Sequence, residues 1–403
     1  MTIRELPPAF DLLAACTGPA PFLFERDGRG VAAPSAPGAE RGASDETGIR
    51  ALGERALRRL RTLEGPHAAV GGFAFAADVD GWLDVPEWLV RRTEPGPTIL
   101  VGSGPSQEPR FAPLRLSGPT APIGGARIRE RPSADAYGEA VVAATERIRD
   151  RELTKVVLAR LVEADADRDL DPCRLAHRLR AVDPHAFTFA RATGTGTDPS
   201  MLVGASPELL VARNGRTVRS TPLAGSAPRA GDVGQDRARA EALRSSAKDR
   251  EEHAVVVEAI AATLGPVCER LDWDPEPVLL ETANLWHLAT RFEGILREPA
   301  PSAVDLVAAL HPTPAVCGTP RDTARAIIAA LEPFARGGYA GPVGWMDAAG
   351  DGEWAIALRC AELEGAHARL YAGAGIVGAS EPALEVEETE RKFRAFLDAL
   401  RWG

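Results

Sequence analysis

The sequence has little of the material from which disulfide frameworks, structural zinc sites and membrane spans are built. Its five cysteines are scattered and odd in number, and none stands in CxxC or Cys/His spacing. They are typical of reduced residues, which favours a cytoplasmic protein without a zinc site. No run approaches the ~18 apolar residues of a membrane-spanning helix, and the first residues lack the basic and apolar segments of a secretory signal.

Positive charge is also in short supply. Lys and Arg number 47 against 57 Asp and Glu, which gives a formal net charge of −10. This balance argues against a nucleic-acid-binding surface or a surface for anionic membranes, so we expect neither partner. Any anionic ligand must then be bound by cations gathered locally.

The chain is long enough to bury a large core, with 403 residues of which 45% are hydrophobic, and length alone suggests two or three domains. Segments typical of strands and of helices occur in clusters rather than in regular alternation, which favours an α+β fold with largely antiparallel sheets. Long helices are predicted at 235–246, 249–264, 321–332 and 383–401. The runs KVVLARLVEAD and WAIALRCAEL are each predicted to form one strand.

Two acidic pairs lie inside predicted amphipathic helices: Asp249 with Glu252, and Glu385 with Glu388. A spacing of three residues puts both carboxylates of a pair on one helical face, opposite an apolar stripe. Four carboxylates brought together would repel one another unless a cation joined them, and ligands that offer only oxygen suit Mg²⁺. The alternative is two solvated acidic helix faces, which is the commoner meaning of a single pair.

Two further residues could transfer protons. Lys155 begins an otherwise apolar strand; such a lysine usually reaches the surface, but desolvation in a pocket would make its neutral amine available as a base. Glu208 follows a Ser-Pro turn in GASPELLVAR. An acid there is more often solvated, but with a raised pKa it could serve as a general acid.

The remaining candidates lie within or next to apolar segments in the C-terminal part of the sequence. His287 in LWHLAT is either a buried core histidine or a residue of a site, and Arg359 needs a carboxylate partner from the protein or from a substrate. GAGIVG matches the glycine spacing of dinucleotide-binding proteins, but the residues after it offer no strand to complete such a unit. Gly373 and Gly375 more plausibly let backbone N–H groups approach a small anion.

Several segments together resemble the chorismate-utilising enzymes, and within them isochorismate synthases of the siderophore-type branch. They occur in the order of that family: KVVLAR, GASPELL, STPLAGSAPR, KDREEHAVVVE, LWHLAT, LHPTPAVCGTPR, GGYAGPVGWMD and GAGIVGASEPALEVEETERKF. The likeness covers roughly 130–403, and 1–130 is more divergent. It implies one large α+β domain over 1–403, with two internally related halves and paired antiparallel sheets sandwiched between helices. It also implies an isomerase (a hydroxymutase) that needs Mg²⁺ and no organic cofactor.

The resemblance assigns a role to each matched position. Lys155 would activate water for attack at ring carbon 2 of chorismate, and Glu208 would protonate the departing 4-hydroxyl. Glu252 and Glu388 would be the principal Mg²⁺ ligands, with Asp249 and Glu385 acting behind them. The other implied site residues are Gly225, Ser226 and Lys392 for the ring carboxylate, Arg359, Tyr339, Gly373 and Gly375 for the enolpyruvyl carboxylate, His287 near the ring, and Ala315.

Other members of the family are less well matched. Anthranilate synthases rely on a glutaminase, whose nucleophilic Cys and partner His are missing here, and aminodeoxychorismate synthases can carry a lysine at the position of Ala224. Salicylate synthases, which also eliminate pyruvate, remain the alternative, although they tend to have Thr where this chain has Ala315. A non-catalytic homologue that keeps the fold is the remote alternative. We expect a monomer that binds chorismate without a glutaminase subunit.

Overall fold

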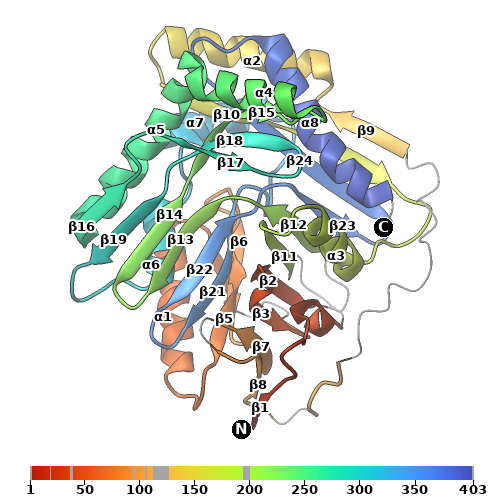
Figure 1. Cartoon of the computed structure of the whole chain (residues 1–403), viewed down its shortest axis with the longest axis vertical. Helices are drawn as coiled ribbons and strands as arrows, with labels where there is room; N and C mark the ends of the chain where they lie inside the picture. The colour runs from red at the N-terminus through yellow and green to blue at the C-terminus, as the bar shows by residue number, and fades with distance from the viewer. Residues whose placement is uncertain are drawn as a thin grey trace.

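The computed structural model describes residues 2–18, 20–36, 40–93, 96–104, 107–111, 127–193 and 200–401, without the side chains of 395 and 398–401. Its strands form three antiparallel sheets, two large and one small (Figure 1). Within these ranges no helix is both long and apolar enough to cross a membrane.

The first large sheet contains twelve strands and includes both the beginning of the chain and its last strand. In order across the sheet they are β1 (Thr2–Glu5), β8 (Ile99–Gly102), β7 (Trp88–Arg92), β3 (Arg29–Ala33), β2 (Phe22–Arg26), β11 (Phe187–Ala192), β12 (Met201–Ser206), β23 (Cys360–Glu364), β24 (His367–Ile376) and β10 (Lys155–Asp165), with β20 (Gly318–Thr319) and β9 (Arg127–Arg131) both paired to β10.

The second large sheet contains nine strands, and the small sheet three. The nine are β16 (Cys268–Trp273), β19 (Phe292–Leu296), β14 (Thr217–Thr221), β13 (Leu209–Asn214), β22 (Gly352–Ile356), β21 (Pro342–Asp347), β5 (Ala68–Gly72), β6 (Asp80–Asp84) and β4 (Arg41–Ala43). The three are β15 (Leu223–Pro228), β18 (Leu285–Ala289) and β17 (Val278–Glu281).

Helices cover all three sheets. Those on the first sheet are α2 (Ala134–Arg149), α3 (Pro172–Val182), α7 (Arg321–Leu331) and α8 (Pro382–Arg401). Those on the second are α1 (Glu46–Leu60) and α6 (Ala303–Leu310), and those on the small sheet are α4 (Val233–Ser245) and α5 (Ala247–Leu264). Two short 3₁₀ turns, η1 (Leu12–Ala15) and η2 (Gly265–Val267), complete the described elements. The four helices predicted from the sequence are confirmed, with ends that differ by at most two residues.

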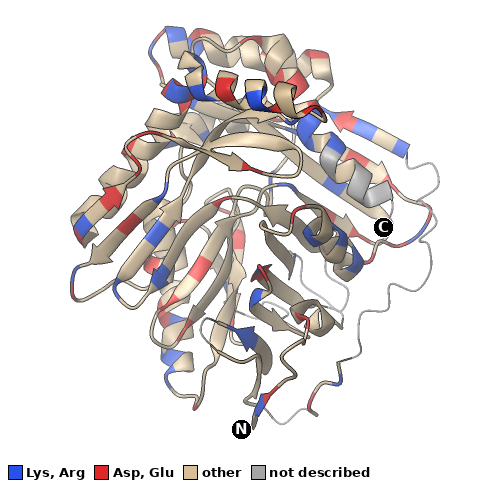
Figure 2. Ribbon diagram, viewed as in Figure 1, with Lys and Arg blue, Asp and Glu red and all other residues tan. Residues whose placement is uncertain are grey.

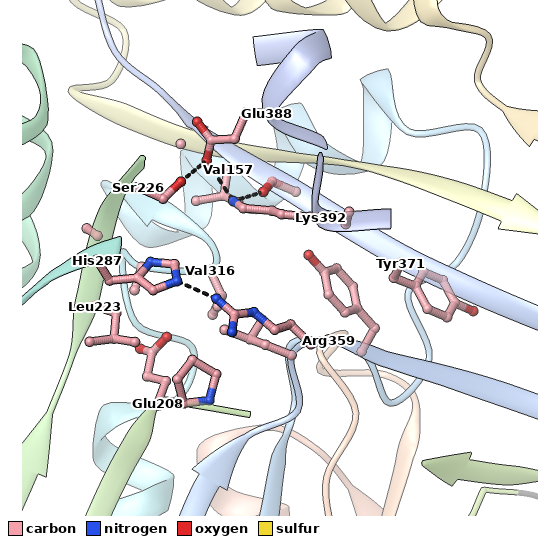
Figure 3. Close-up of a pocket in the computed structure, with 18 of the residues that line it drawn as sticks. Val157, Glu208, Leu223, Ser226, His287, Val316, Arg359, Tyr371, Glu388 and Lys392 are labelled. Carbon is pink, nitrogen blue, oxygen red and sulfur yellow. Dashed lines mark hydrogen bonds and ion pairs between the residues drawn. The ribbon is translucent and has the colours of Figure 1, made fainter. Parts of the chain in front are cut away.

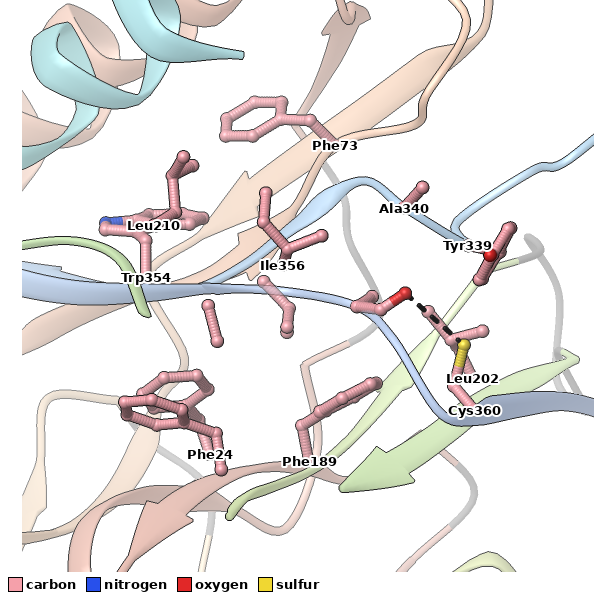
Figure 4. Packing of buried hydrophobic residues seen from close by; sticks show 14 of the residues in the cluster. Phe24, Phe73, Phe189, Leu202, Leu210, Tyr339, Ala340, Trp354, Ile356 and Cys360 are labelled. Atoms are coloured by element: carbon pink, nitrogen blue, oxygen red, sulfur yellow. Dashed lines mark hydrogen bonds between the residues drawn. The ribbon is translucent and has the colours of Figure 1, made fainter. Parts of the chain in front are cut away.

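The core fills the space between the two large sheets (Figure 4). Phe24 and Phe189 come from the first sheet, Trp354 and Ile356 from the second, and all four are fully buried. Phe73 stacks on Trp354, with ring centroids 5.6 Å apart. Because apolar residues from both inner faces meet here, the sheets pack on each other as a sandwich.

The first 130 residues and the rest of the chain share both large sheets. Strand β2 pairs with β11 in the first sheet, and β5 pairs with β21 in the second. The predicted α+β class with antiparallel sheets is confirmed. Since both sheets need strands from both parts, we propose that 1–403 folds as one domain. The internal relation between two halves stays a prediction.

Candidate active site

The candidate site lies where the chain crosses from one large sheet to the other. Two such crossings form the site. One runs from β12 to β13 through Pro207 and Glu208, and the other runs from β22 to β23 at Arg359. The two crossings lie side by side, because the Ile356 N–H donates to the Glu208 carbonyl and the Ala205 N–H to the Arg359 carbonyl, each at 3.2 Å. Glu208 and Arg359 are thereby held at the junction of the two sheets.

This arrangement corrects one prediction. The run WAIALRCAEL is two strands in different sheets rather than one, and Arg359 stands in the link between them. Its φ is +47°, in the left-handed region that residues other than glycine seldom adopt. A costly backbone conformation that turns a charged side chain into a cavity is typical of functional sites.

A cavity of about 830 Å³, counting its open mouth, occupies the junction. All but three of the predicted site residues line it, and several are labelled in Figure 3. The lining residues among them are Glu208, Gly225, Ser226, Glu252, His287, Ala315, Tyr339, Arg359, Gly373, Gly375, Glu388 and Lys392. Lys155, Asp249 and Glu385 lie outside this lining.

Glu208 is 2% exposed. Burial raises its pKa to about 8, against the opposing influence of the nearby Lys155 ammonium group and a backbone hydrogen bond from Leu223. The carboxyl group is therefore largely protonated at neutral pH, as a general acid must be. The alternative of a solvated acid at a strand edge is excluded by this burial.

Lys155 is fully buried at the first position of β10, so the alternative of a surface lysine is wrong. Its Nζ lies 2.9 Å from Glu252 Oε1, yet it makes no well-directed hydrogen bond with any residue in the described ranges. The ion pair with Glu252 therefore leaves hydrogen-bonding capacity of this buried amine unused, which is uncommon for a buried donor. Lys155 stands behind Glu252 relative to the cavity.

The two acidic pairs reach this region from opposite helices. Helix α5 packs on β15 and α8 on β24. The prediction that the acids lie opposite the apolar stripes is wrong, because Glu252 shares the buried face of α5 with Val256, and Glu385 shares that of α8 with Phe393. Glu252 and Glu388 consequently project into the cavity, whereas Glu385 is 1% exposed beneath it. The reading of two solvated acidic faces is therefore wrong.

Each of the three glutamates is paired with a lysine. Glu252 contacts Lys155, and Glu388 Oε1 accepts hydrogen bonds from Lys392 Nζ at 2.7 Å and from Ser226 Oγ at 3.0 Å (Figure 3). Although burial opposes it, Lys392 holds the pKa of Glu388 below its usual value.

The third glutamate–lysine pair, formed by Glu385 and Lys248, lies beneath the cavity. Lys248 Nζ lies 2.5 Å from Glu385 Oε1. Within the described ranges, no three Asp, Glu, His or Cys side chains are gathered as a ready metal site. The expected assembly of carboxylates around one cation is therefore not preformed among the described residues, where each of the three glutamates is paired with a lysine.

The donor set still fits Mg²⁺. Glu252 and Glu388 present carboxylate oxygens to the same cavity, and hard cations prefer such oxygens. Burial and the neighbouring Glu252 and Glu388 raise the pKa of Asp249; burial and Glu388 raise that of Glu385. Both carboxyl groups are thus harder to ionise than usual, first because they are buried and second because other carboxylates lie nearby, and a divalent cation would favour their ionised forms.

A second positively charged group, the Arg359 guanidinium, lies in the same cavity as Lys392. The Arg359 guanidinium Nη2 donates to His287 Nε2, as the dashed line in Figure 3 shows, and Nη1 lies 3.8 Å from Asp183 Oδ2. Burial, together with Arg359 and Lys392, lowers the pKa of His287 well below its usual value. The neutral ring therefore accepts from Arg359 and also makes a backbone hydrogen bond with Gly225. His287 holds Arg359 in place.

Glycines bring the backbone close to these groups. A Cβ on Gly375 would lie 2.0 Å from Glu252 Oε1, and one on Gly373 2.9 Å from the Tyr339 hydroxyl. Gly225 has a φ of +78° and passes close to Asp249. These positions require glycine, since a side chain would displace a site residue.

Comparison with known proteins agrees with this geometry. The sequence pattern described as chorismate binding enzyme matches residues 119–401. The isochorismate synthase DhbC of Bacillus subtilis (strain 168) is 46% identical over 276 residues, which cover 68% of this chain and 69% of that protein. The chain belongs to the chorismate-binding enzyme family.

Other chorismate-binding enzymes and their structures extend the comparison. The vibriobactin-specific isochorismate synthase of Vibrio cholerae is 40% identical over 274 residues, covering 68% of this chain and 69% of that protein. MenF, the menaquinone-specific isochorismate synthase of Escherichia coli, superposes with a TM-score of 0.82 at 26% identity, covering 99% of this chain and 94% of that one. Anthranilate synthase component I of Streptococcus pneumoniae shares the fold, with a TM-score of 0.69 at 20% identity over 98% of this chain and 92% of that one.

Sequence reasoning missed two charged residues of this chorismate-binding enzyme. Lys248 holds Glu385, and Asp183 faces Arg359 from the end of α3. Lys248 could have been suspected, because it directly precedes Asp249 in the KDREEH segment. Asp183 carries no comparable signal in the sequence.

Proposed function

We propose that this chain is an isochorismate synthase, an isomerase that converts chorismate to isochorismate. The observation that carries this proposal is the buried Glu208 carboxyl group, with a pKa of about 8, in a cavity that also holds Arg359 and Lys392. A largely protonated acid among cations suits a dicarboxylate substrate that must lose a hydroxyl group. The relatives named as isochorismate synthases support the same reaction.

In the proposed mechanism, water adds at ring carbon 2 and the 4-hydroxyl group leaves from ring carbon 4. Lys155, acting as its neutral amine, takes the proton from the attacking water, and Glu208 gives its proton to the departing 4-hydroxyl, which leaves as water. The ring double bonds shift between these carbons, so the product is an isomer of the substrate. Because Nζ now lies behind Glu252, the proposal requires Glu252 to move off Lys155 in the substrate complex.

The cations of the cavity would bind the two carboxylates. Lys392 and the Ser226 hydroxyl, with the Gly225 backbone, are placed for the ring carboxylate. Arg359 and the Tyr339 hydroxyl, with the backbone at Gly373 and Gly375, are placed for the enolpyruvyl carboxylate. His287 keeps Arg359 oriented, so its role in this proposal is positioning rather than proton transfer.

Glu252 and Glu388 are the proposed Mg²⁺ ligands, with Asp249 and Glu385 behind them. When bound, the cation would supply local positive charge for the ring carboxylate. We propose that the enzyme acts as a monomer without a glutaminase, since its nucleophile is water. The five buried cysteines, none in a disulfide, support a cytoplasmic location.

The test is product analysis. Purified protein incubated with chorismate and Mg²⁺ should give isochorismate as the main product, resolved chromatographically, and Glu208→Gln protein should not. Fluorescent salicylate as the main product would identify a salicylate synthase instead and would show that Ala315 does not distinguish the two activities. Full turnover by Glu208→Gln would refute the proposed acid.

A further inference from the structure

Two more cavities continue from the active-site cavity toward the surface. The inner one shares Arg359, Lys392 and Phe396 with the active-site cavity. The outer one shares Asn284 and Arg391 with the inner one. The three cavities therefore lie in a row, and the row ends between α8, the C-terminal end of β15 and helix α4 (Figure 1).

Exposure increases along the same row. Glu208, at the deep end, is 2% exposed. The side chains of Arg359 and Lys392 are 21% and 20% exposed. The row therefore leads from the proposed reaction centre to bulk water.

Arginines dominate the outer cavity. It is lined by Arg229, Arg239, Arg391 and Arg394, against Glu387 and Glu390 as its acids. Figure 2 shows basic residues on both α4 and α8, the helices that border it. In a protein with a net charge of −10, such an excess of cations at one opening is a local exception.

Two of these arginines, Arg239 and Arg394, form no ion pair with any carboxylate in the part of the chain that the structure describes. Arg229 is bound by Asp236 and Glu281, and Arg391 by Glu387. Arg239 donates to the Arg229 carbonyl, which leaves its charge uncompensated, and within the described ranges Arg394 forms no hydrogen bond or ion pair. Both are exposed, on different helices at the same mouth.

We propose that this row of cavities is the entrance for the dicarboxylate substrate, and that Arg239 and Arg394 form an anion-binding subsite at its mouth. This inference rests on the proposed function. A dianion attracted to the mouth would pass Arg391 and then reach Arg359 and Lys392. Along the inner and outer cavities the lining cations outnumber the lining acids, which are Asp183, Glu387 and Glu390. Charges at a cleft mouth raise the local concentration of an oppositely charged substrate and its rate of association.

Replacing both exposed arginines tests the subsite. At about 10 mM ionic strength, where the Debye length is ~30 Å, R239Q/R394Q should lower kcat/KM for chorismate by about three- to tenfold. Its kcat should stay within about twofold of wild type, because neither side chain reaches the deep end of the cavity. At about 1 M ionic strength, where the Debye length is ~3 Å, the two proteins should have equal kcat/KM.

The matched control is R58Q/R237Q, which removes the same charge from two exposed helical positions outside these cavities. Arg237 lies on the same helix as Arg239, so the control also tests for an effect of α4 itself. Equal thermal unfolding of all three proteins should show that none is misfolded. The control should lose clearly less kcat/KM than R239Q/R394Q at low salt, and it should match wild type at high salt.

Two outcomes would overturn the inference. If the active wild-type enzyme and R239Q/R394Q had the same kcat/KM at low salt, the arginines would not form a substrate subsite. If the loss persisted unchanged at high salt, they would act through local structure rather than through charge. A wild-type protein that forms no isochorismate would instead refute the proposed function, and this inference with it.

Discussion

Gly375 offers the sharpest test of how closely the site is packed. It lies on β24 opposite Val157 of β10, and its missing side chain makes room for Glu252. In G375A the new Cβ would lie 2.0 Å from Glu252 Oε1, 2.6 Å from its Cδ and 3.0 Å from Lys155 Cε. Because the nearest atoms belong to side-chain ends, they can withdraw without unfolding the protein.

The size of the effect follows from these distances. Ordinary contacts of a Cβ begin near 3.4 Å, so the Glu252 carboxylate must retreat by roughly 1.4 Å. A misplacement of about 1 Å in a reacting constellation can cost about 10²-fold in rate, and we expect a loss of that size in kcat/KM. Overpacking typically costs about 1–3 kcal/mol of stability, so the protein should still fold.

Steady-state kinetics, thermal unfolding and calorimetric titration with Mg²⁺ would measure these effects. Mg²⁺ binding should weaken by about tenfold or more, since Glu252 is a proposed ligand. G378A is the matched control, because a Cβ there would meet its nearest neighbour at 3.7 Å, and it should behave as wild type. Wild-type activity and Mg²⁺ affinity in G375A would refute the placement of Glu252.

Four further predictions concern the residues and the metal of the proposed chemistry. Because burial raises the pKa of Glu208 to about 8, kcat/KM should fall as pH rises through about 8, and E208Q should lose about 10²–10⁴-fold in rate together with that pH dependence. The same carboxyl favours the folded state fully below its ordinary pKa of 4.5, and this contribution disappears as pH rises toward 8, so E208Q should lose less stability than wild type over that interval in denaturant titrations. K155A should keep its fold by circular dichroism but lose turnover, and a fully active K155A would rule Lys155 out as the base. Excess EDTA should abolish isochorismate formation and added Mg²⁺ restore it; activity that survives EDTA would contradict the metal requirement.

The helices that carry the acidic pairs could be predicted because their information is local. In 249–264 and 383–401, apolar residues recur at helical spacing. Packing of Val256 and Phe393 in the core then fixes which way the acids point. The spacing of residues along the sequence was therefore enough to predict these two helices.

The crossings between sheets could not be predicted in the same way. WAIALRCAEL is apolar from 354 to 361 apart from Arg359, and β propensity does not state which sheet a strand joins. The division of this segment into two strands is visible only in the structure, where β22 pairs with β13 in the second sheet and β23 pairs with β12 in the first. The pairing of Glu385 with Lys248 was equally hidden, even though Lys248 stands next to Asp249, since the two paired residues are 137 positions apart in the chain. Such contacts depend on tertiary structure rather than on local pattern.

The charges around the acidic pairs predict that metal and substrate bind interdependently. Four carboxylates face three ammonium groups there, those of Lys155, Lys248 and Lys392, so this end of the cavity carries one net negative charge when all are ionised. A substrate carboxylate is repelled by that charge, and a divalent cation reverses its sign. Chorismate should therefore bind at least about tenfold more tightly with Mg²⁺ present, and Mg²⁺ should gain the same factor from chorismate, because coupling between two ligands is reciprocal. Calorimetric titrations of E208Q, which is expected not to consume the substrate, would measure both factors. Affinities that are independent of each other would show that Arg359 and Lys392 attract the substrate without help from a metal.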